Sequence, residues 1–516
     1  MLTKSELQSH LQCARKLWLE RHKPELVAKD DPGTYRRAVD GNIVAEKARE
    51  QLGAGFIWPP SKDGKKEAAV AAKDLLRQSP GVAAAEVPMV FGELYARADA
   101  LIPGGDQYAL RETKASNFPL KNDKITPGMP KQHHLEDLAI QAWVMTGSGL
   151  SIGRVELNLL NGRWRYPGGG DYAGLFRQLD VTGEINVLKN KVPGWLDDAK
   201  QTLNGEMPKT QTGKHCSDPY ECPFQDHCKK LDPAGPEHPI ELLPDNAGKQ
   251  LAKKLRDTKG YSSVLEPQPE ELIGAQSGLY RRIQESHRTG RAILDVSVAE
   301  IVKAFPYPRY YFDFEGIDFP VPRWAGVRPY EHVTFQWSCH VERTPDVFEH
   351  YEFLDLSGND PSLPCIQRIR EVIDQNDGGP IFVYYAPYEK ARLQGLADRH
   401  PAYELLLAGY VNRLVDLLPL IKGNYYHPRM QGSFSIKKVI PTIAPDLSYD
   451  ELGEIQDGTA AQVAYLHAVF DAEAAPQRKS ELEDNLRKYC RQDTWAMVEV
   501  AYFLSQAGRP RRPEGM

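Results

Sequence analysis

The stretch RYYFDFEGIDFP, from Arg309 to Pro320, places two carboxylates in the middle of an aromatic segment with a strand-like composition. Side chains two residues apart on a β-strand point to the same face of the sheet, so Asp313 and Glu315 are expected to lie side by side. Two carboxylates among aromatic side chains repel each other unless a cation lies between them. The residues alone leave two interpretations: charges on the rim of an edge strand, or half of a metal site.

Partners for this pair occur further along the chain. Tyr489 and Asp493, in YCRQD, are four residues apart in a segment predicted to be helical, so they share one helix face. Glu389, in VYYAPYEKARL, directly follows a segment that we expect to be a buried strand. A site for two metal ions needs about four ligands. The carboxylates of these segments therefore supply a candidate set, together with Asp313 and Glu315.

These motifs, in this order, resemble the DEDDy branch of the RNase H-like (DnaQ-type) 3′–5′ exonucleases over residues 305–505. The resemblance implies that the carboxylates bind two Mg²⁺ or Mn²⁺ ions, bridged by Asp313, and that Tyr489 orients the attacking water. Glu389 departs from the family pattern, which has Asp at this place. Asp416 is a rival carboxylate. In the superfamily an Asp at such a position commonly binds no metal, so Asp416 ranks behind Glu389.

A second group of charged residues lies in a β-hairpin predicted in the first half of the chain. Asp99, in RADAL, ends one strand, and Glu112 and Lys114, in RETKAS, share a face of its partner. Two carboxylates and a lysine at a strand pair can hold a divalent cation and position a water for attack on phosphate. The alternative is an exposed charge pair on a hairpin, because Glu-x-Lys occurs by chance in most long proteins.

Together with a predicted helix that carries Gln141, these residues resemble the RecB-type branch of the PD-(D/E)xK nucleases over residues 1–230. The resemblance implies a restriction-endonuclease-like fold, with Asp99 and Glu112 as metal ligands and Lys114 and Gln141 as catalytic partners. The chain departs from the family pattern, which has proline, histidine and an aromatic residue at the positions of Ala98, Ala45 and Met145. Glu46 is a candidate replacement for the missing histidine.

Four of the seven cysteines form a third pattern. CSDPYECPFQDHC spaces Cys216, Cys222 and Cys228 widely, and Cys13 lies in a helix predicted over KSELQSHLQCARKLWLERHKPEL, with Thr3 or Ser5 as its N-cap. Zinc sites usually use closer pairs, so this spacing favours a larger cluster, with zinc and free thiols as alternatives. One remote cysteine and a triplet resemble the iron–sulfur staple of RecB-like nucleases, which implies a structural [4Fe–4S] cluster.

Length and composition limit the interpretation. Because 516 residues exceed one ordinary core, we expect a nuclease-like domain over 1–232, a linker with a basic helical segment over 233–304, and an exonuclease-like domain over 305–508. The hydrophobic fraction of 41% and the charged fraction of 26% are typical of soluble globular proteins. A net charge of -6 argues against a protein that coats nucleic acid by bulk charge, but it permits a local basic groove.

The sequence has no apolar run long enough for a transmembrane helix. Its first residues, MLTKSELQSHLQ, lack the apolar core of a signal peptide. We therefore expect a cytoplasmic protein that does not bind membranes.

Several phrases, among them CARKLWLERHKPEL, FDFEGIDFPVPRW and GSFSIKKVIP, resemble a family of bacterial proteins that fuse an iron–sulfur RecB-like nuclease domain to an RNase H-like exonuclease domain. The resemblance implies an α/β protein that is a metal-dependent nuclease, acting on DNA in preference to RNA. It implies 3′–5′ cleavage at the C-terminal site, leaves a second activity at the N-terminal site open, and suggests protein partners in DNA repair or defence against foreign DNA. The alternative is a nucleic-acid-binding protein whose nuclease sites are inactive.

Overall fold

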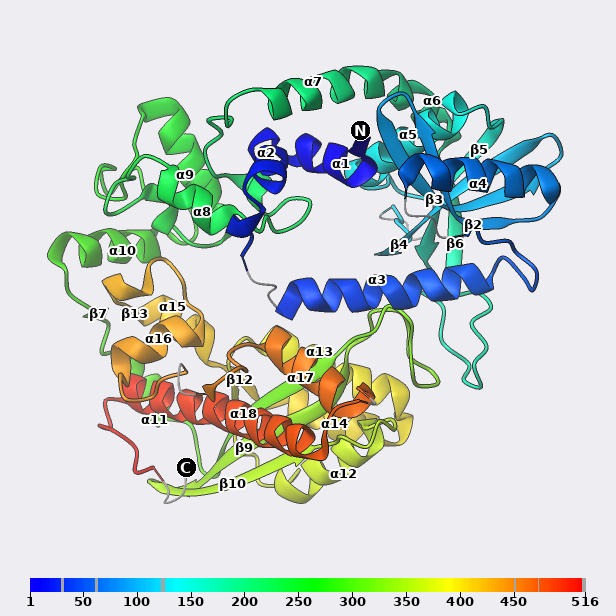
Figure 1. Ribbon diagram of the computed structural model, residues 1–516. Helices are drawn as coiled ribbons and strands as arrows, with labels where there is room; N and C mark the ends of the chain where they lie inside the picture. The colour runs from blue at the N-terminus through cyan, green and yellow to red at the C-terminus, as the bar shows by residue number, and fades with distance from the viewer. Residues whose placement is uncertain (29–31, 61–63, 122–125, 450–451, 472, 513–516) are drawn as a thin grey trace. The chain divides into compact units, whose positions relative to one another are not determined.

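The computed structural model is a mixed α/β protein with mixed parallel and antiparallel sheets (Figure 1). It divides into two compact units: unit 1 comprises Met1–Pro233 and Asp318–Glu331, and unit 2 comprises Ala234–Ile317 and His332–Met516. None of the described helices combines the length and hydropathy that a membrane span requires. The structure describes residues 1–28, 32–60, 64–121, 126–449, 452–471 and 473–512.

Unit 1 is built on a mixed sheet with the strand order β1-β3-β4-β5-β6, in which β2 also pairs with β3. The predicted hairpin that carries Asp99, Glu112 and Lys114 is formed by β3 and β4, and Gly105 in its turn takes a left-handed conformation (φ 69°). Strands β4 and β5 run parallel, and the helix α5 connects them. The strands are β1 (Leu2–Thr3), β2 (Ala84–Phe91), β3 (Leu94–Gly104), β4 (Gln107–Asn117), β5 (Ile152–Leu160) and β6 (Phe176–Asp180).

The first helical segment of unit 1 is broken at Cys13. Thr3 caps the helix α1 in a capping box with Glu6, as one of the two predicted N-caps. The continuous helix predicted through Cys13 is wrong, because Cys13 is extended (φ -165°, ψ 121°) between α1 and α2. The apolar spacing continues through this residue, so it gave no signal of the break. The helices are α1 (Lys4–Gln12), α2 (Ala14–His22), α3 (Pro32–Glu50), α4 (Lys65–Gln78), α5 (Gln132–Gly147), α6 (Thr182–Leu188), α7 (Val192–Asn204) and α8 (Gln225–Leu231).

The segment Asp318–Glu331 completes the core of unit 1, although its neighbours in sequence belong to unit 2. Its backbone exchanges two hydrogen bonds with Tyr166: the N–H of Gly326 donates to the Tyr166 carbonyl (2.7 Å), and the N–H of Tyr166 donates to the Val327 carbonyl (3.0 Å). The phenol of Tyr330 donates to the carbonyl of Ala115 on β4 (2.7 Å). A small hydrophobic cluster of this unit includes Val44, Leu160, Leu175, Phe176 and Val321.

Unit 2 is built on a five-stranded sheet with the order β10-β9-β8-β11-β12. The first three strands pair antiparallel, whereas β11 runs parallel to both β8 and β12. A pair of short strands, β7 and β13, forms a separate antiparallel ladder. The strands are β7 (Ile293–Leu294), β8 (Arg309–Ile317), β9 (Val333–Thr344), β10 (Val347–Leu354), β11 (Ile381–Val383), β12 (Leu414–Asp416) and β13 (Tyr425–Tyr426).

Helices cover both faces of this sheet, and β8 alternates between them. Phe312 and Phe314 pack into a cluster with residues of α12, α13 and α14, whereas Tyr311 belongs to the cluster that contains the C-terminal part of α18. Residues 313 and 315 therefore point to the face of the sheet on which α18 lies. The helices of this part are α12 (Ser362–Val372), α13 (Ala386–Arg399), α14 (Glu404–Asn412), α15 (Leu417–Asn424), α16 (Ile436–Ile443), α17 (Gly458–Phe470) and α18 (Pro476–Ser505).

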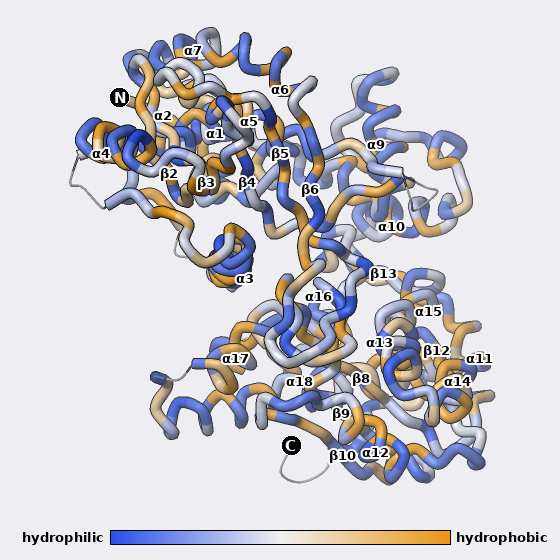
Figure 2. Tube along the Cα trace, turned by 90° about the vertical axis from the view of Figure 1, so that its right-hand side faces the viewer, coloured by the Kyte–Doolittle hydropathy of each residue, from blue (hydrophilic) through white to orange (hydrophobic). Residues whose placement is uncertain are grey.

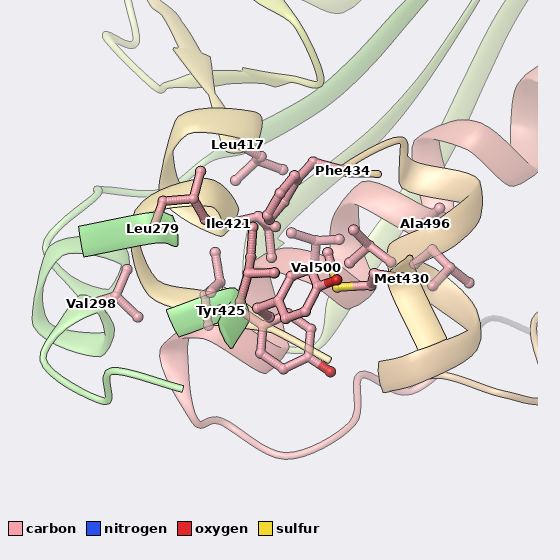
Figure 3. Close-up of a cluster of buried hydrophobic side chains, with 14 of the residues drawn as sticks. Leu279, Val298, Leu417, Ile421, Tyr425, Met430, Phe434, Ala496 and Val500 are labelled. Carbon is pink, nitrogen blue, oxygen red and sulfur yellow. The ribbon is translucent and has the colours of Figure 1, made fainter. Parts of the chain in front are cut away.

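The stretch predicted as a linker forms part of the core of unit 2. It carries α9 (Asp245–Lys259), α10 (Ser277–Thr289) and α11 (Val298–Lys303). Figure 3 shows Leu279 and Val298 from this stretch in one cluster with Leu417, Ile421 and Val500. Hydrophobic and hydrophilic residues mix along α9 (Figure 2), as expected for a helix with one buried face.

The basic residues of α10 bond mainly within unit 2. Arg281 donates to the carbonyl of Pro269 (3.0 Å) and Arg282 to the carbonyl of Lys422 (3.0 Å). Arg288 pairs with Glu285 (2.9 Å). These side chains therefore satisfy backbone and carboxylate acceptors of the same unit.

Candidate metal centre

The carboxylate centre of unit 2 consists of Asp313, Glu315, Glu389 and Asp493. One oxygen from each of Asp313, Glu315 and Asp493 lies within 4.8 Å of the others, a grouping found nowhere else among the described residues. The strand β8 supplies two of these residues because alternate side chains share a face, and α18 supplies Asp493 from the helix that packs on that face. The structure brings together Asp313, Glu315 and Asp493, which the sequence singles out, and their role as metal ligands stays a prediction.

Glu389 reaches the same centre from the first turn of α13. Its side chain is 1% exposed, and in the described part of the chain its Oε2 atom has no hydrogen-bond partner. Burial raises the pKa of Glu389 to about 8, and its charge in turn raises the pKa values of Asp313 and Glu315. An unpartnered carboxylate oxygen at this depth is energetically unfavourable, and a bound cation would relieve it.

When its four carboxylates are ionised, the centre carries more negative than positive charge. Burial and the neighbouring Asp493 raise the pKa of Glu315 to about 8. Burial, Asp493 and Glu315 raise the pKa of Asp313 well above its usual range, and burial raises that of Asp493. The ammonium of Lys437 opposes these shifts at Asp313, Glu315 and Asp493. Arg392 lowers the pKa of Glu389. One lysine and one arginine cannot balance four ionised carboxylates, so the ionised form of the centre calls for further positive charge.

Two tyrosines and Lys437 form the polar wall of the centre. Lys437 Nζ donates to the phenolic oxygen of Tyr489 (3.1 Å), and the phenol of Tyr449 donates to Asp493 Oδ1 (2.6 Å). Burial, followed by the charge of Asp493, raises the pKa of Tyr489 far above its usual value, so its phenol stays protonated. The sequence predicted Tyr489 from its spacing to Asp493. It gave no spacing signal for Lys437 or Tyr449, which come from separate segments.

Asp416, the rival to Glu389, is occupied by backbone donors. Its carboxylate accepts from the N–H groups of Tyr385 (3.0 Å), Ala386 (2.9 Å) and Leu418 (3.0 Å). It therefore caps the start of α15 and holds the chain that enters α13. This bonding gives Asp416 a role in placing Glu389, which lies one turn into that helix.

The N-terminal charge cluster of unit 1 contains Asp99, Glu112, Lys114 and Gln141, as the sequence predicts, and two residues that it did not: Lys4 and Asp137. Lys114 Nζ donates to Glu112 Oε1 (2.6 Å) and to Asp137. Lys4 Nζ lies 2.8 Å from Asp137 Oδ1 and 3.3 Å from Glu112 Oε1. Gln141 donates to Glu112 Oε2 (2.7 Å) and to Asp137 Oδ1 (2.9 Å).

Asp99 lies beside this network, where the ladder between β3 and β4 ends with the pair Ala100 and Arg111. Its carboxylate accepts a hydrogen bond from the backbone N–H of Thr113 on β4 (2.8 Å). Burial and the charge of Glu112 raise the pKa of Asp99 to about 8. By contrast, Lys4 and Lys114 hold the pKa of Asp137 well below its usual range, although burial opposes them.

The two lysines of this cluster are held as cations. Burial alone would lower the pKa of Lys114, but Glu112 and Asp137 raise it well above its usual value. The same two carboxylates raise the pKa of Lys4. The cluster is therefore largely neutralised by its own side chains, and its prediction as a metal site stays a prediction.

The four candidate cluster cysteines of unit 1 come close enough to influence one another. Burial raises the pKa of the Cys222 and Cys228 thiols, and the charges of Cys13 and Cys216 raise both further. Beside Cys13, the amide of Gln12 donates to the carbonyls of His215 (2.9 Å) and Tyr220 (2.7 Å). This pair of bonds ties the junction of α1 and α2 to the loop of the cysteine triplet.

The spacing of these sulfurs bears on what they could hold. A tetrahedral zinc site has Zn–S bonds of about 2.3 Å, which places its sulfurs roughly 3.8 Å apart. The cysteines are not among the groups of described residues whose ligand atoms lie within 4.8 Å of one another. The assignment of a [4Fe–4S] cluster to these cysteines stays a prediction.

A family model described as a domain of unknown function (DUF2779) matches residues 310–435. This range contains Asp313, Glu315 and Glu389 and ends before α18, which carries Tyr489 and Asp493. No curated protein matches the chain.

Proposed function

We propose that the protein is a metal-dependent nuclease that hydrolyses phosphodiester bonds of nucleic acid at the carboxylate centre of unit 2, from the 3′ end. The observation that carries the proposal is the convergence of Asp313, Glu315 and Asp493 within 4.8 Å. The unpartnered oxygen of Glu389 supports a cation at the same place. DNA is the preferred substrate over RNA, in a cytoplasmic role in repair or in defence against foreign DNA with protein partners.

The topology supports an RNase H-like fold for unit 2. In the order β10-β9-β8-β11-β12, the strand that comes first along the chain lies at the centre, two antiparallel strands lie on one side and two parallel strands on the other. This is the order expected of an RNase H-like sheet, and the carboxylates lie on its first strand and on its last helix. In unit 1, the β3–β4 hairpin carries Asp99, Glu112 and Lys114, and α5 carries Gln141. This order of elements and residues supports a PD-(D/E)xK-like assignment for unit 1.

The carboxylates fit Mg²⁺ or Mn²⁺, which are hard cations that prefer oxygen ligands. Asp313, Glu315, Glu389 and Asp493 would hold these ions. When bound, such ions lower the pKa of a water and stabilise charge on the transferring phosphate.

The remaining residues of the centre prepare it for this chemistry. Tyr489 stays protonated because of its raised pKa, and its contacts with Asp493 and Lys437 hold the phenol in the centre, where its O–H would orient a water or a phosphate oxygen. Tyr449 donates to Asp493 Oδ1 and so helps to fix this carboxylate in the centre. Asp416 fixes the start of α13 and thereby the position of Glu389.

The test uses end-labelled single- and double-stranded DNA and RNA with Mn²⁺, Mg²⁺ or EDTA. Wild-type protein should produce a ladder that shortens from the 3′ end with Mn²⁺ and no product with EDTA. The variant Asp313→Asn should lose at least about a thousand-fold in rate, because it removes a carboxylate that would hold the metal ions. Asp398→Asn, an exposed position on the same helix as Glu389, is the control and should cleave normally. Cleavage by Asp313→Asn at the wild-type rate would refute the proposal.

For unit 1 we propose a [4Fe–4S] cluster held by Cys13, Cys216, Cys222 and Cys228 as a structural staple. Anaerobically purified protein should be brown and contain iron and sulfide, and Cys222→Ser should lose both. Cys365→Ser is the control, because Cys365 is buried in α12 of the other unit. Stoichiometric zinc in place of iron would contradict the assignment.

A second candidate function, binding of nucleic acid without cleavage, is favoured for unit 1 alone. Lys4 lies between Glu112 and Asp137, where its ammonium takes the charge-balancing place that a metal ion would take at a cleavage site. The expected result is that Asp99→Asn leaves nuclease activity unchanged under the same assay. A loss of one class of product in Asp99→Asn would instead reveal a second active site.

A further inference from the structure

A cavity of about 660 Å³ in unit 2 is lined by segments that lead into α13 and α16, the helices that carry Glu389 and Lys437. It is lined by α9, by the residues that enter α13 and α16, and by α15. The residues on which the inference rests are Lys249, Tyr385, Lys422, Phe434, Ser435 and Ile436.

Two short segments connect the cavity to the centre. The phenol of Tyr384 donates to the carbonyl of Phe434 (2.7 Å), which joins the segment before α13 to the segment before α16. Glu389 follows in the first turn of α13, and Lys437, which contacts Tyr489, follows in the first turn of α16. A molecule in the cavity is therefore bounded by the same backbone that places Glu389 and Lys437.

Tyr385 is held in a conformation that disfavours any residue with a side chain. Its backbone is left-handed (φ 84°, ψ 65°), and its N–H is fixed by Asp416. Its side chain is 55% exposed, so burial of the ring does not offset the strain. Glycine would adopt this conformation freely. A strained, exposed aromatic residue at the mouth of a cavity points to a contact with a ligand.

The charges around the cavity favour an anion. Its two carboxylates already have partners, because Asp245 pairs with Lys422 (3.0 Å) and Glu241 pairs with Arg256. Lys249 on α9 is exposed at the cavity wall. Ser435 and Ile436 add the N-terminal end of α16, where the helix dipole and backbone N–H groups attract negative charge.

We propose that this cavity binds single-stranded nucleic acid next to the end that reaches the carboxylate centre. Tyr385 stacks on a base, and Lys249 and the first turn of α16 hold a phosphate. Phe434 is 5% exposed and belongs to the core, so it supplies a wall and not a second stacking surface. The inference rests on the proposed function, of which it specifies the substrate class and the path of the strand.

The test measures binding and not cleavage. A fluorescently labelled single-stranded 12-mer DNA is titrated with protein in EDTA, and binding is followed by anisotropy. Tyr385→Gly should weaken binding by at least about five-fold, because it removes the stacking ring. Its melting temperature should equal or exceed that of the wild type, since glycine removes the backbone strain. Lys249→Gln should weaken binding and reduce its salt dependence, whereas Lys254→Gln, an exposed lysine on the same helix outside the cavity, should not.

Three outcomes would overturn the inference. Binding by Tyr385→Gly and Lys249→Gln at wild-type strength would remove the cavity from the binding surface. Competition by dTMP at the same concentration as the 12-mer would assign the cavity to a single nucleotide and not to a strand. Equally strong binding of blunt duplex DNA would contradict the single-stranded assignment.

The inference and the proposed function fail separately. If Asp313→Asn still cleaves while Tyr385→Gly binds weakly, the nuclease centre is misassigned and the binding cavity stands. If Asp313→Asn loses cleavage while Tyr385→Gly binds normally, only the cavity is misassigned.

Discussion

The two units each bury a group of carboxylates on or beside a sheet, and they neutralise it in different ways. In unit 1, Glu112 and Asp137 share the ammonium groups of Lys4 and Lys114. In unit 2, Lys437 opposes the charge of Asp313, Glu315 and Asp493, and Arg392 opposes that of Glu389, one oxygen of which has no hydrogen-bond partner in the described part of the chain.

The amount of positive charge that the chain itself supplies distinguishes a structural charge cluster from a metal centre. Buried carboxylates need compensating positive charge in both cases. Where lysines of the chain supply this positive charge, as in unit 1, removal of one carboxylate leaves a lysine unpaired. Where the chain supplies too little positive charge, as in unit 2, removal of one carboxylate relieves repulsion between those that are left. The same type of substitution should therefore have opposite effects on the stability of the two units.

The largest expected effect follows from Asp137→Asn in unit 1. This change leaves Lys4 and Lys114 with less negative charge in a buried site, and it should destabilise unit 1 by about 3 kcal/mol. Hydrogen exchange of peptides from β4 and α5 would measure the loss, with peptides from β8 as the internal control. Unchanged protection of β4 would show that the lysines are not held by Asp137.

The second prediction concerns the polar wall of the centre. Tyr489→Phe should slow cleavage about a hundred-fold, because it removes the hydroxyl that orients a water or phosphate oxygen. Tyr449→Phe removes a donor to Asp493 but leaves that hydroxyl, so it should lose less than about ten-fold. Single-turnover rates of cleavage on an end-labelled substrate would measure the loss in each variant. Equal losses in the two variants would place the two phenols in equivalent roles.

The third prediction is a pH dependence of stability in EDTA. The pKa values of Glu315 and Glu389 are raised to about 8 in the folded protein, so the stability they contribute is full below about pH 4.5 and is lost as pH rises towards 8. Unit 2 should therefore unfold more readily at pH 8 than at pH 5, as hydrogen exchange of β8 peptides would show.

Unit 1 provides the contrast for this measurement. Asp99 acts in the same direction as the glutamates of unit 2, since its pKa is also raised to about 8. Asp137 acts in the opposite direction: its pKa is lowered, so its contribution is present above its usual value near 3.8 and is lost at lower pH. Hydrogen exchange at pH 5 and pH 8 should therefore change less in β4 than in β8. A steeper change in β4 would reverse the comparison.

The smallest effect is expected from Asp313→Asn in EDTA. Replacing one of four mutually repelling carboxylates should stabilise metal-free unit 2 by about 1 kcal/mol, with protection of β8 peptides as the measurement. Destabilisation by a similar amount would mean that Asp313 is paired in the absence of metal.

The sequence predicts the parts of each site that local geometry determines. Asp313 and Glu315 share a face because strands alternate, and Tyr489 and Asp493 share one because they are a helical turn apart. The cations were missed for a physical reason: a lysine can reach a buried carboxylate from any segment, and no spacing rule links Lys437 to β8 or Lys4 to β4. Asp137 did carry a signal, since it lies one turn before Gln141 on α5.

Domain boundaries were harder to predict than site residues. Proline-rich stretches between residues 233 and 304 suggested a linker, but the apolar faces of α9 and α10 pack into unit 2. The segment Asp318–Glu331 follows the Asp-x-Glu strand directly, yet it belongs to unit 1. Its pairing with Tyr166 depends on contacts between residues far apart in sequence, which local patterns do not encode.

Binding of Mn²⁺, followed by electron paramagnetic resonance, tests the central claim most directly. The measurement compares wild-type protein with Asp313→Asn and Asp99→Asn, one substitution in each unit. Tight binding of Mn²⁺ should be lost in Asp313→Asn and retained in Asp99→Asn, because the cations beside the carboxylate centre of unit 2 do not balance its four carboxylates, whereas Lys4 and Lys114 largely neutralise the cluster of unit 1. Retention of tight binding in Asp313→Asn together with its loss in Asp99→Asn would contradict this account.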